Sequence, residues 1–119
     1  MTLEEIVEAL VRVKGVSAAA IVDYGSGMML ASKNLNPDFD LEIAAAGNVS
    51  VMRNKIKVMN HLELGDTLHD IQVDLQTQYH FICPCSQKEG MFIYMVADRQ
   101  TANLSIIRRS LFHAETLVV

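Results

Sequence analysis

Residues 41–64, LEIAAAGNVSVMRNKIKVMNHLEL, determine how the rest of this sequence is interpreted. The stretch contains no proline and a single glycine, and its apolar residues recur at helical spacing. A first stripe along the predicted helix consists of Leu41, Ala45, Val49, Met52, Ile56 and Met59. A second stripe lies beside it and consists of Ala44, Val51, Val58 and Leu62, with Asn48 and Lys55 along the seam. The pattern therefore predicts one long helix with two adjacent apolar faces.

Two adjacent stripes indicate two apolar neighbours, because one stripe is enough to seat a surface helix on its own domain. The helix would be roughly 36 Å long, about the full width of a domain of this size. A second copy of the chain is the simplest cover for the extra stripe, and the small residues Ala44 and Gly47 would let another backbone approach. The alternative is one wide apolar arc that faces the core of a monomer.

The composition excludes several classes of protein. A chain of 119 residues supports one domain, residues 1–119, and a hydrophobic content of 50% argues against disorder. A net charge of −4 without a basic stretch argues against a nucleic-acid binder. No apolar run approaches the length of a membrane span, and the N-terminus, MTLEEIVEALVRV, lacks the pattern of a secretion signal. We therefore expect a cytoplasmic location.

Upstream of the long helix, the sequence predicts a helix and a β-hairpin. Thr2 and Glu5 fit a capping box, and Gly15 is expected to end the helix that they begin. Strands are predicted from Val16 to Tyr24 and from Met28 to Ser32, joined by the turn Gly25-Ser26-Gly27. The loop from Lys33 to Asp40 then brings an acidic residue to the start of the long helix.

Downstream of it, Gly65 is the expected stop, and three further strands and a last helix follow. The strands are predicted at Thr67 to Leu75, Tyr79 to Cys83 and Met91 to Ala97, of which the last is apolar on both faces and should be central. Thr101 or Asp98 is expected to cap a helix whose inner stripe is Leu104, Ile107, Leu111, Ala114 and Val118. The order α-β-β-α-β-β-β-α predicts an α+β domain with a five-stranded antiparallel sheet covered by helices.

Motifs for chemistry are absent from the sequence, including phosphate-binding glycine loops, H-E-x-x-H and G-x-S-x-G. Cys83 and Cys85 would close too small a ring for a stable disulfide, and a zinc ion would need two more ligands. On a strand, His69 and Asp70 would point to opposite faces, as would His80 and Cys83, which argues against a metal or a thiol–imidazole pair at those positions. We therefore predict no catalytic residue, cofactor or metal.

Three other features have plain structural interpretations. Asn103 lies in the first turn of the last helix, where its side chain can satisfy free backbone N–H groups. Arg108 and Arg109 most simply form a solvated helix face. The methionines at positions 52, 59, 91 and 95 have adaptable side chains that suit a core or a forgiving partner surface.

Several segments together resemble the roadblock family, also called the dynein light chain seven type, and especially its prokaryotic members. They cover nearly the whole chain in the order of the family. They are GVSAAAIVDYGSGMMLAS (15–32), LEIAAAGN (41–48), DTLHDIQVDLQTQYHFI (66–82), GMFIYMVADR (90–99) and TANLSIIRRSL (101–111).

The resemblance implies a roadblock/profilin-like fold with the long helix on one face of the sheet and the terminal helices on the other. It also implies a homodimer in which the long helices pack antiparallel and the third strands pair across the two-fold axis. We expect the interface to contain Ala44, Gly47, Asn48, Val51, Lys55, Val58 and Leu62 of the long helix, and Leu68, Asp70 and Gln72 beyond it.

Family members typically act as non-catalytic platforms for small Ras-like GTPases, and some modulate nucleotide hydrolysis. The resemblance therefore implies a GTPase partner here, and we place its contacts at Arg53, Asn54, Lys57 and His61 on the polar side of the long helix. No residue matches an arginine finger. A small-ligand sensor of similar fold is the alternative, and an enzyme, which would rest only on the cysteines and histidines, is the third possibility.

Overall fold

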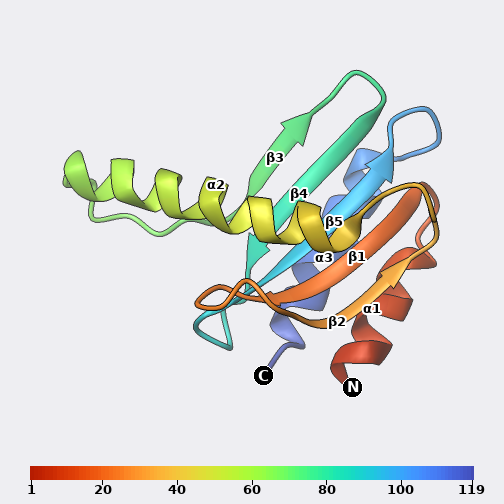
Figure 1. Ribbon diagram of the computed structural model, residues 1–119, viewed down its shortest axis with the longest axis horizontal. Coiled ribbons are helices and arrows are strands. Elements are labelled where there is room, and N and C mark those ends of the chain that lie inside the picture. The colour runs from red at the N-terminus through yellow and green to blue at the C-terminus, as the bar shows by residue number, and fades with distance from the viewer.

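The sheet is built around the strand Met91–Asp98 (β5), MFIYMVAD, which is apolar on both faces and lies in its centre. The strand order is β2-β1-β5-β4-β3, and all neighbouring strands are antiparallel. The computed structural model describes residues 1–119. Its elements are α1 (Leu3–Val11), β1 (Val16–Asp23), β2 (Met29–Asn34), α2 (Leu41–His61), β3 (Ile71–Asp74), β4 (Gln78–Pro84), β5 and α3 (Leu104–Thr116). Helix α2 crosses one face of the sheet, and α1 and α3 cover the other (Figure 1). The predicted fold class and order of elements are confirmed.

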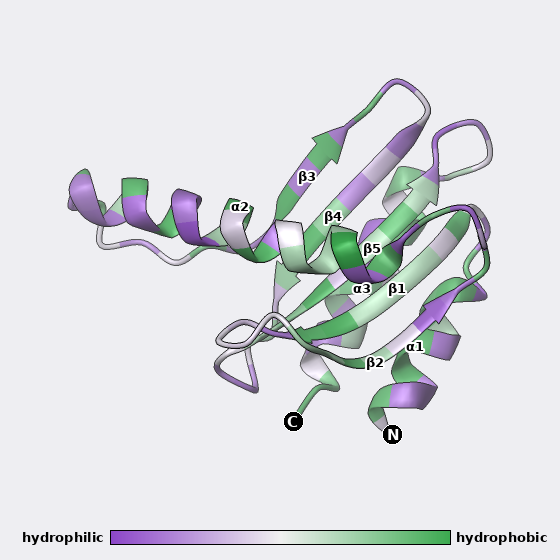
Figure 2. Ribbon diagram, in the orientation of Figure 1, coloured by the Kyte–Doolittle hydropathy of each residue, from purple (hydrophilic) through white to green (hydrophobic).

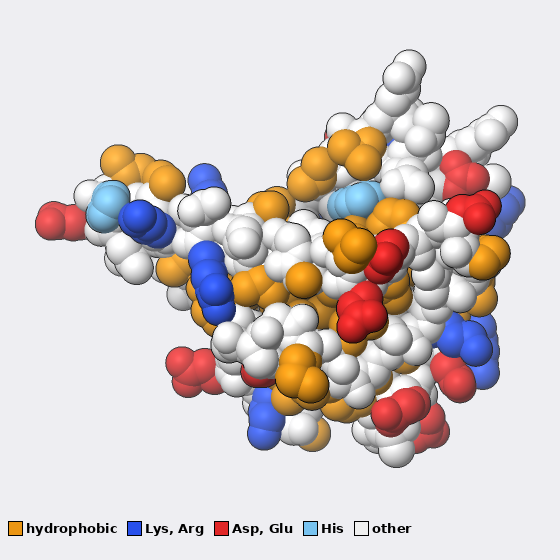
Figure 3. Space-filling model, viewed as in Figure 1, with side chains coloured by type: hydrophobic (Ala, Val, Ile, Leu, Met, Phe, Trp, Pro, Cys, Tyr) orange, Lys and Arg blue, Asp and Glu red, His pale blue; other side chains and the backbone are white.

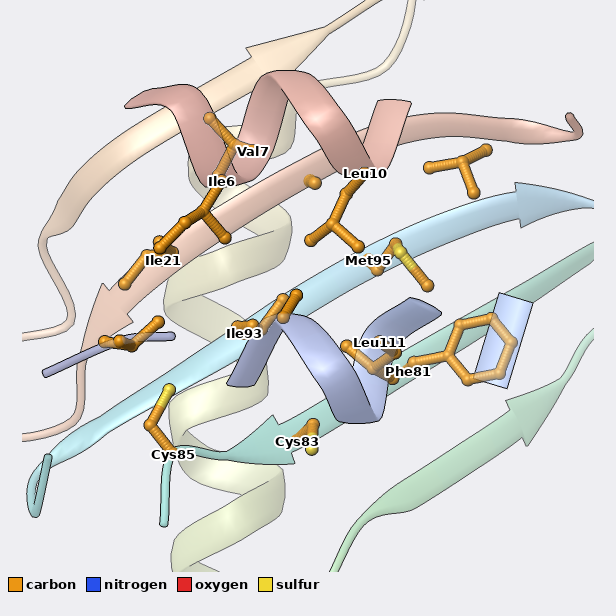
Figure 4. Packing of buried hydrophobic residues seen from close by; sticks show 14 of the residues in the cluster. Ile6, Val7, Leu10, Ile21, Phe81, Cys83, Cys85, Ile93, Met95 and Leu111 are labelled. Atoms are coloured by element: carbon orange, nitrogen blue, oxygen red, sulfur yellow. The ribbon is translucent and has the colours of Figure 1, made fainter. Parts of the chain in front are cut away.

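Each face of the sheet has its own hydrophobic core, because side chains alternate between the faces of a strand. Phe92, Tyr94 and Val96 of β5 lie under α2 in one cluster. Ile93 and Met95 point the other way, into a cluster with side chains of α1 and α3 (Figure 4). Figure 2 shows the contrast between the sheet interior, which is hydrophobic, and α2, along which hydrophobic and hydrophilic residues alternate.

The starts of the three helices follow sequence rules. Thr2 and Glu5 form the predicted capping box, and the Asp40 carboxylate accepts from the Ile43 N–H at the start of α2. The role predicted for Asn103 is confirmed, since its side chain accepts from the Ile106 N–H, but the predicted cap residue of α3 was wrong, because Asn103 itself is the N-cap. Neither Thr101 nor Asp98 has that role, because the chain turns between them, with the Asp98 carboxylate accepting from the Gln100 N–H.

The predicted glycine stops lie beyond the true helix ends. Helix α1 ends at Val11, and Gly15 instead occupies the turn into β1 with φ +93°. Helix α2 ends at His61, and Glu63 takes the left-handed conformation directly after its C-cap, with φ 54°, while Gly65 is left-handed two residues later, with φ 60°. The Leu64 N–H then donates to the Met59 carbonyl, which completes the hydrogen-bond pattern typical of a helix end.

Strand β3 is much shorter than the stretch from Thr67 to Leu75 that alternation predicted. It pairs with β4 only from Ile71↔Ile82 to Asp74↔Tyr79. Continuing this register backwards would place His69 opposite Pro84, which has no N–H to donate. Residues 66–70 therefore run as an irregular segment beneath α2 into the sheet edge.

A chain of polar side chains ties β4 to β5 beneath α2, and nothing in the sequence pattern indicated it. The His80 ring lies 2.9 Å from the Tyr94 hydroxyl and 2.9 Å from the Gln78 side-chain oxygen, and Phe39 packs edge-on against it. Burial lowers the pKa of His80 and raises that of Tyr94 to about 12. Both groups are therefore neutral in the folded chain at neutral pH.

The burial of His80 predicts that the folded chain loses stability at acidic pH. Because its folded-state pKa is lowered, the stability that neutral His80 contributes is complete above the unfolded pKa of about 6.5 and is lost as pH falls below it. We expect the melting temperature to fall between about pH 7.5 and pH 5.5, and to fall less in His80→Gln. His61→Gln, at the exposed end of α2, is the control and should leave the pH dependence unchanged; equal slopes in all three proteins would contradict the prediction.

The turn at Gly15 predicts a large cost for an added methyl group. A Cβ there would lie 2.7 Å from the Cα of Ala102, and the backbone conformation is left-handed. Gly90 has φ +87° but nothing within 4 Å, so Gly90→Ala tests strain without a clash. We expect urea unfolding to show a loss of about 1 kcal/mol for Gly90→Ala and roughly 3 kcal/mol for Gly15→Ala. Equal losses would show that the close approach of Ala102 is unimportant.

Candidate protein-binding surface

Helix α2 buries its first apolar stripe on the sheet and leaves the second stripe uncovered. Leu41, Ala45, Val49 and Met52 are buried, and Ile56 and Met59 are half-buried. In the second stripe, the exposed fractions are 42% for Val51, 48% for Val58 and 63% for Leu62. Figures 1 and 3 show that the C-terminal half of α2 projects beyond the sheet, with hydrophobic side chains at its tip and along β3. Within one chain, these three side chains stay exposed, and only Ala44, at the start of the stripe, is half-buried against the core.

An open groove of about 510 Å³ runs along this flank of α2. Its helical wall consists of Val51, Asn54, Lys55 and Val58, and its other wall of Leu68, Asp70 and Ile71. Five of the residues that the sequence places at a dimer interface, Val51, Lys55, Val58, Leu68 and Asp70, therefore lie around one hollow. Ala44 and Asn48 are half-buried further along the helix, and a Cβ at Gly47 would meet nothing within 4 Å.

The sheet ends beside this groove in an edge strand. β3 is last in the strand order, so its outer backbone groups have no partner strand within the chain. Val73 on this strand is 36% exposed and lies on the α2 face, opposite His80. A free apolar edge of this kind pairs readily with another strand.

Gln72 and Asp70, the two interface candidates nearest to α3, are held within the chain by Arg108. The Arg108 guanidinium donates to the Gln72 side-chain oxygen at 2.8 Å and lies 3.1 Å from the Asp70 carboxylate. Burial raises the pKa of Asp70, but hydrogen bonds from His69 and Arg108 outweigh it, and the pKa lies below its usual value. The expectation of a merely solvated Arg108 was therefore wrong.

His69 and Asp70 do meet, although strand geometry predicted that they would not. The His69 ring nitrogen lies 2.7 Å from the Asp70 carboxylate, because residues 66–70 are not a strand and the alternation of faces does not apply to them. The predicted separation of His80 and Cys83 is confirmed, since His80 lies on the α2 side of the sheet and Cys83 in the opposite core. The chain contains no group of three or more side chains placed to hold a metal ion.

The two cysteines are free and buried in the core under α1 and α3. Burial, reinforced by the Glu115 carboxylate, raises the pKa of both thiols to about 12. A thiol with that pKa is protonated at neutral pH and is a poor nucleophile. The structure thus gives the enzyme hypothesis no activated cysteine.

Of the four candidate partner-binding residues on α2, three have exposed side chains and the fourth is held by contacts within the chain. Asn54, Lys57 and His61 are exposed. Arg53 instead donates to the carbonyls of Tyr24 and Gly25 and lies over the Tyr24 ring, 5.3 Å from its centre. Its first role is therefore to fasten α2 to the turn between β1 and β2.

The N-terminal half of α2 packs on the sheet, where Leu41, Ala45 and Val49 share a buried cluster with Ala18 and Ala20. Three hollows that the helix lines are open grooves, one of about 560 Å³ at its start beside β2 and one along each flank, which suits protein contacts better than enclosure of a small ligand. No helix in the structure has the length and apolar character needed to cross a membrane.

Comparisons with known proteins give matches by structure alone. No family model and no curated protein matches the sequence of this chain. A roadblock/LC7 domain from Streptomyces avermitilis superposes with a TM-score of 0.83 at 15% identity, over 99% of this chain and 95% of that one. MglB in a tetrameric arrangement gives 0.82 at 18% identity, over 96% and 82% of the two chains.

MglB from Myxococcus xanthus has the same arrangement of elements, with a TM-score of 0.72 at 16% identity over 95% of this chain and 88% of that one. At such low identity, these likenesses establish the fold. The chain has the fold of the bacterial roadblock/LC7 domains, as the resemblance of its sequence predicted.

Proposed function

We propose that this chain is a roadblock-family protein that acts as a non-catalytic homodimeric platform for a small Ras-like GTPase and modulates or recruits it. The observation that carries the proposal is the uncovered second stripe of α2, beside an unpaired sheet edge. Contiguous apolar surface of this kind marks protein–protein contacts. The roadblock fold and the family resemblance of the sequence supply the class of partner.

In the proposed dimer, the two copies of α2 pack antiparallel along Val51, Val58 and Leu62. The β3 edges pair across the two-fold axis, so that the patch of each copy meets itself and the two sheets continue into one another. This arrangement removes the exposed stripe and both free edges in one contact. Lys57 and His61, both exposed, then lie on the outer face of the helix pair, where the GTPase is proposed to bind, whereas Asn54 lines the groove on the dimer side.

The proposed dimer predicts that a charged residue in the second stripe of α2 prevents dimerisation. Val51→Asp would place an unpaired carboxylate between the two helices, a cost of several kcal/mol. We expect light scattering to show the mass of one chain for Val51→Asp and of two chains for Ser50→Asp, the matched control on the exposed side of α2. A dimer in both variants would show that Val51 is not at the interface.

Gly47→Ala tests how closely the two copies of α2 approach each other in the proposed dimer, and it causes no clash within a single chain. Gly47→Ala fills empty space in the single chain and should stabilise α2 by about 1 kcal/mol through helix propensity. We expect the melting temperature to rise in a Val51→Asp monomer background, and the dimer of the otherwise unaltered chain to dissociate more readily. A dimer that gains as much stability as the monomer would place Gly47 away from the partner backbone.

The partner itself is tested with Ras-like GTPases from the same genome, each loaded with GDP or a non-hydrolysable GTP analogue. We expect one of them to co-elute with the dimer in one nucleotide state only, and Lys57→Glu to weaken the complex without changing the dimer mass. Absence of any nucleotide-dependent complex across the set would contradict the proposed GTPase platform but would not affect the proposed dimer.

A further inference from the structure

The second flank of α2 carries a separate groove of about 430 Å³. It is enclosed by the projecting half of α2, the segment 66–68, the end of β4, the start of β5 and the turn after β1. We call it the methionine groove, since Met52, Met59 and Met91 line it together with Ile56, Leu68 and Pro84.

The methionine groove exists because α2 is longer than the sheet beneath it (Figure 1). Ile56 and Met59, on this half of the helix, remain half-buried, and Ile56 packs against the edge of the core cluster under α2. The segment 66–68 returns under the helix and forms one wall, and Met91 forms part of the opposite wall, also half-buried. The chain therefore builds an apolar groove at the end of the sheet that its own side chains leave unfilled.

The methionine groove is distinct from the proposed dimer contact. Val51 and Val58 lie on the other flank of α2, and only Leu68, beneath the helix, lines both hollows. Arg53 fastens the Tyr24 end of the methionine groove through two backbone carbonyls. Both walls thus persist whether α2 is paired with a second copy or not.

The chemistry of the lining defines the ligand. Met52 is buried in the core, whereas the thioether side chains of the half-buried Met59 and Met91 are flexible and polarisable, and can adapt to apolar residues of different shapes. The only charged residues that line the groove are Asp66 and Glu89, both exposed carboxylates. Apolar anchors combined with a negative rim favour a ligand with an apolar stripe and basic flanks.

We propose that the methionine groove binds an amphipathic helical segment of another protein, with two or three apolar anchors and flanking lysine or arginine residues. The apolar side chains pack against the half-buried Ile56, Met59 and Met91, above the buried Met52, and the basic residues face Asp66 and Glu89. The proposal depends on neither the GTPase nor the dimer. It gives the platform a second docking site on the flank away from the two-fold axis.

Two designed helical peptides serve as probes, one of leucine and lysine and one of leucine and glutamate with the same spacing. We expect the leucine–lysine peptide to bind the full chain about tenfold more tightly or better, measured by fluorescence anisotropy at low salt. Combining Asp66→Asn with Glu89→Lys should abolish or reverse that preference. The Asp66→Asn change keeps an oxygen for the Thr67 N–H, which the native carboxylate accepts at 2.8 Å.

A matched control makes the same change in net charge on α1, with Glu8→Gln and Glu4→Lys at exposed positions. It should leave the preference intact. An equal effect of both pairs of substitutions would mean that the peptides sense only net charge, and equal binding of both peptides would mean nonspecific apolar contact; either result overturns the proposal, as does binding of neither peptide.

Methionine methyl signals in NMR spectra locate the contact. Titration with the leucine–lysine peptide should shift Met52, Met59 and Met91 and leave the exposed Met1 and Met28 unchanged. The same three signals should shift in the Val51→Asp variant, because the methionine groove does not require the partner copy. Shifts confined to other methionines would contradict the proposed site.

Discussion

The structure depends on a mismatch between α2 and the sheet that supports it. The helix carries apolar residues around more of its circumference than the sheet contacts, and it continues past the end of the strands. Packing against Ala18, Ala20 and Phe92 stabilises its N-terminal half in the core. The same helix then holds Val58 and Leu62 in solvent. Burying these side chains in a contact with another protein would gain the hydrophobic free energy that the single chain leaves unused.

Both of the surfaces proposed to bind other proteins lie along the flanks of this one helix. One flank faces the free edge of β3, which makes it suitable for a symmetric contact with a second copy. The other flank forms the methionine groove with the end of the sheet. The opposite face, under α1 and α3, is by contrast a closed core that contains both cysteines. This division gives the proposed platform two separate surfaces for other proteins.

Much of the fold was predictable because it follows from periodicity. The stripes of α2, the central position of β5 and the caps at Thr2 and Asp40 depend on residues near one another in sequence.

Most of the predictions that failed concern features that depend on residues far apart in the sequence. Pro84 across the sheet shortens β3, and Glu63 adopts a left-handed backbone that sequence rules reserve for glycine. The Arg108–Asp70 pair and the His80–Tyr94 contact join residues whose proximity no local pattern encodes. The methionine groove likewise requires five separated segments, so only its methionines were visible beforehand.

In the proposed dimer, a second copy of this chain covers the outer stripe of α2. Sedimentation equilibrium of the unaltered chain, over a wide range of concentration, measures this association. We expect the mass of two chains at all but the lowest concentrations. The mass of a single chain throughout, with the amides around Val58 and β3 exchanging freely with solvent, would contradict it.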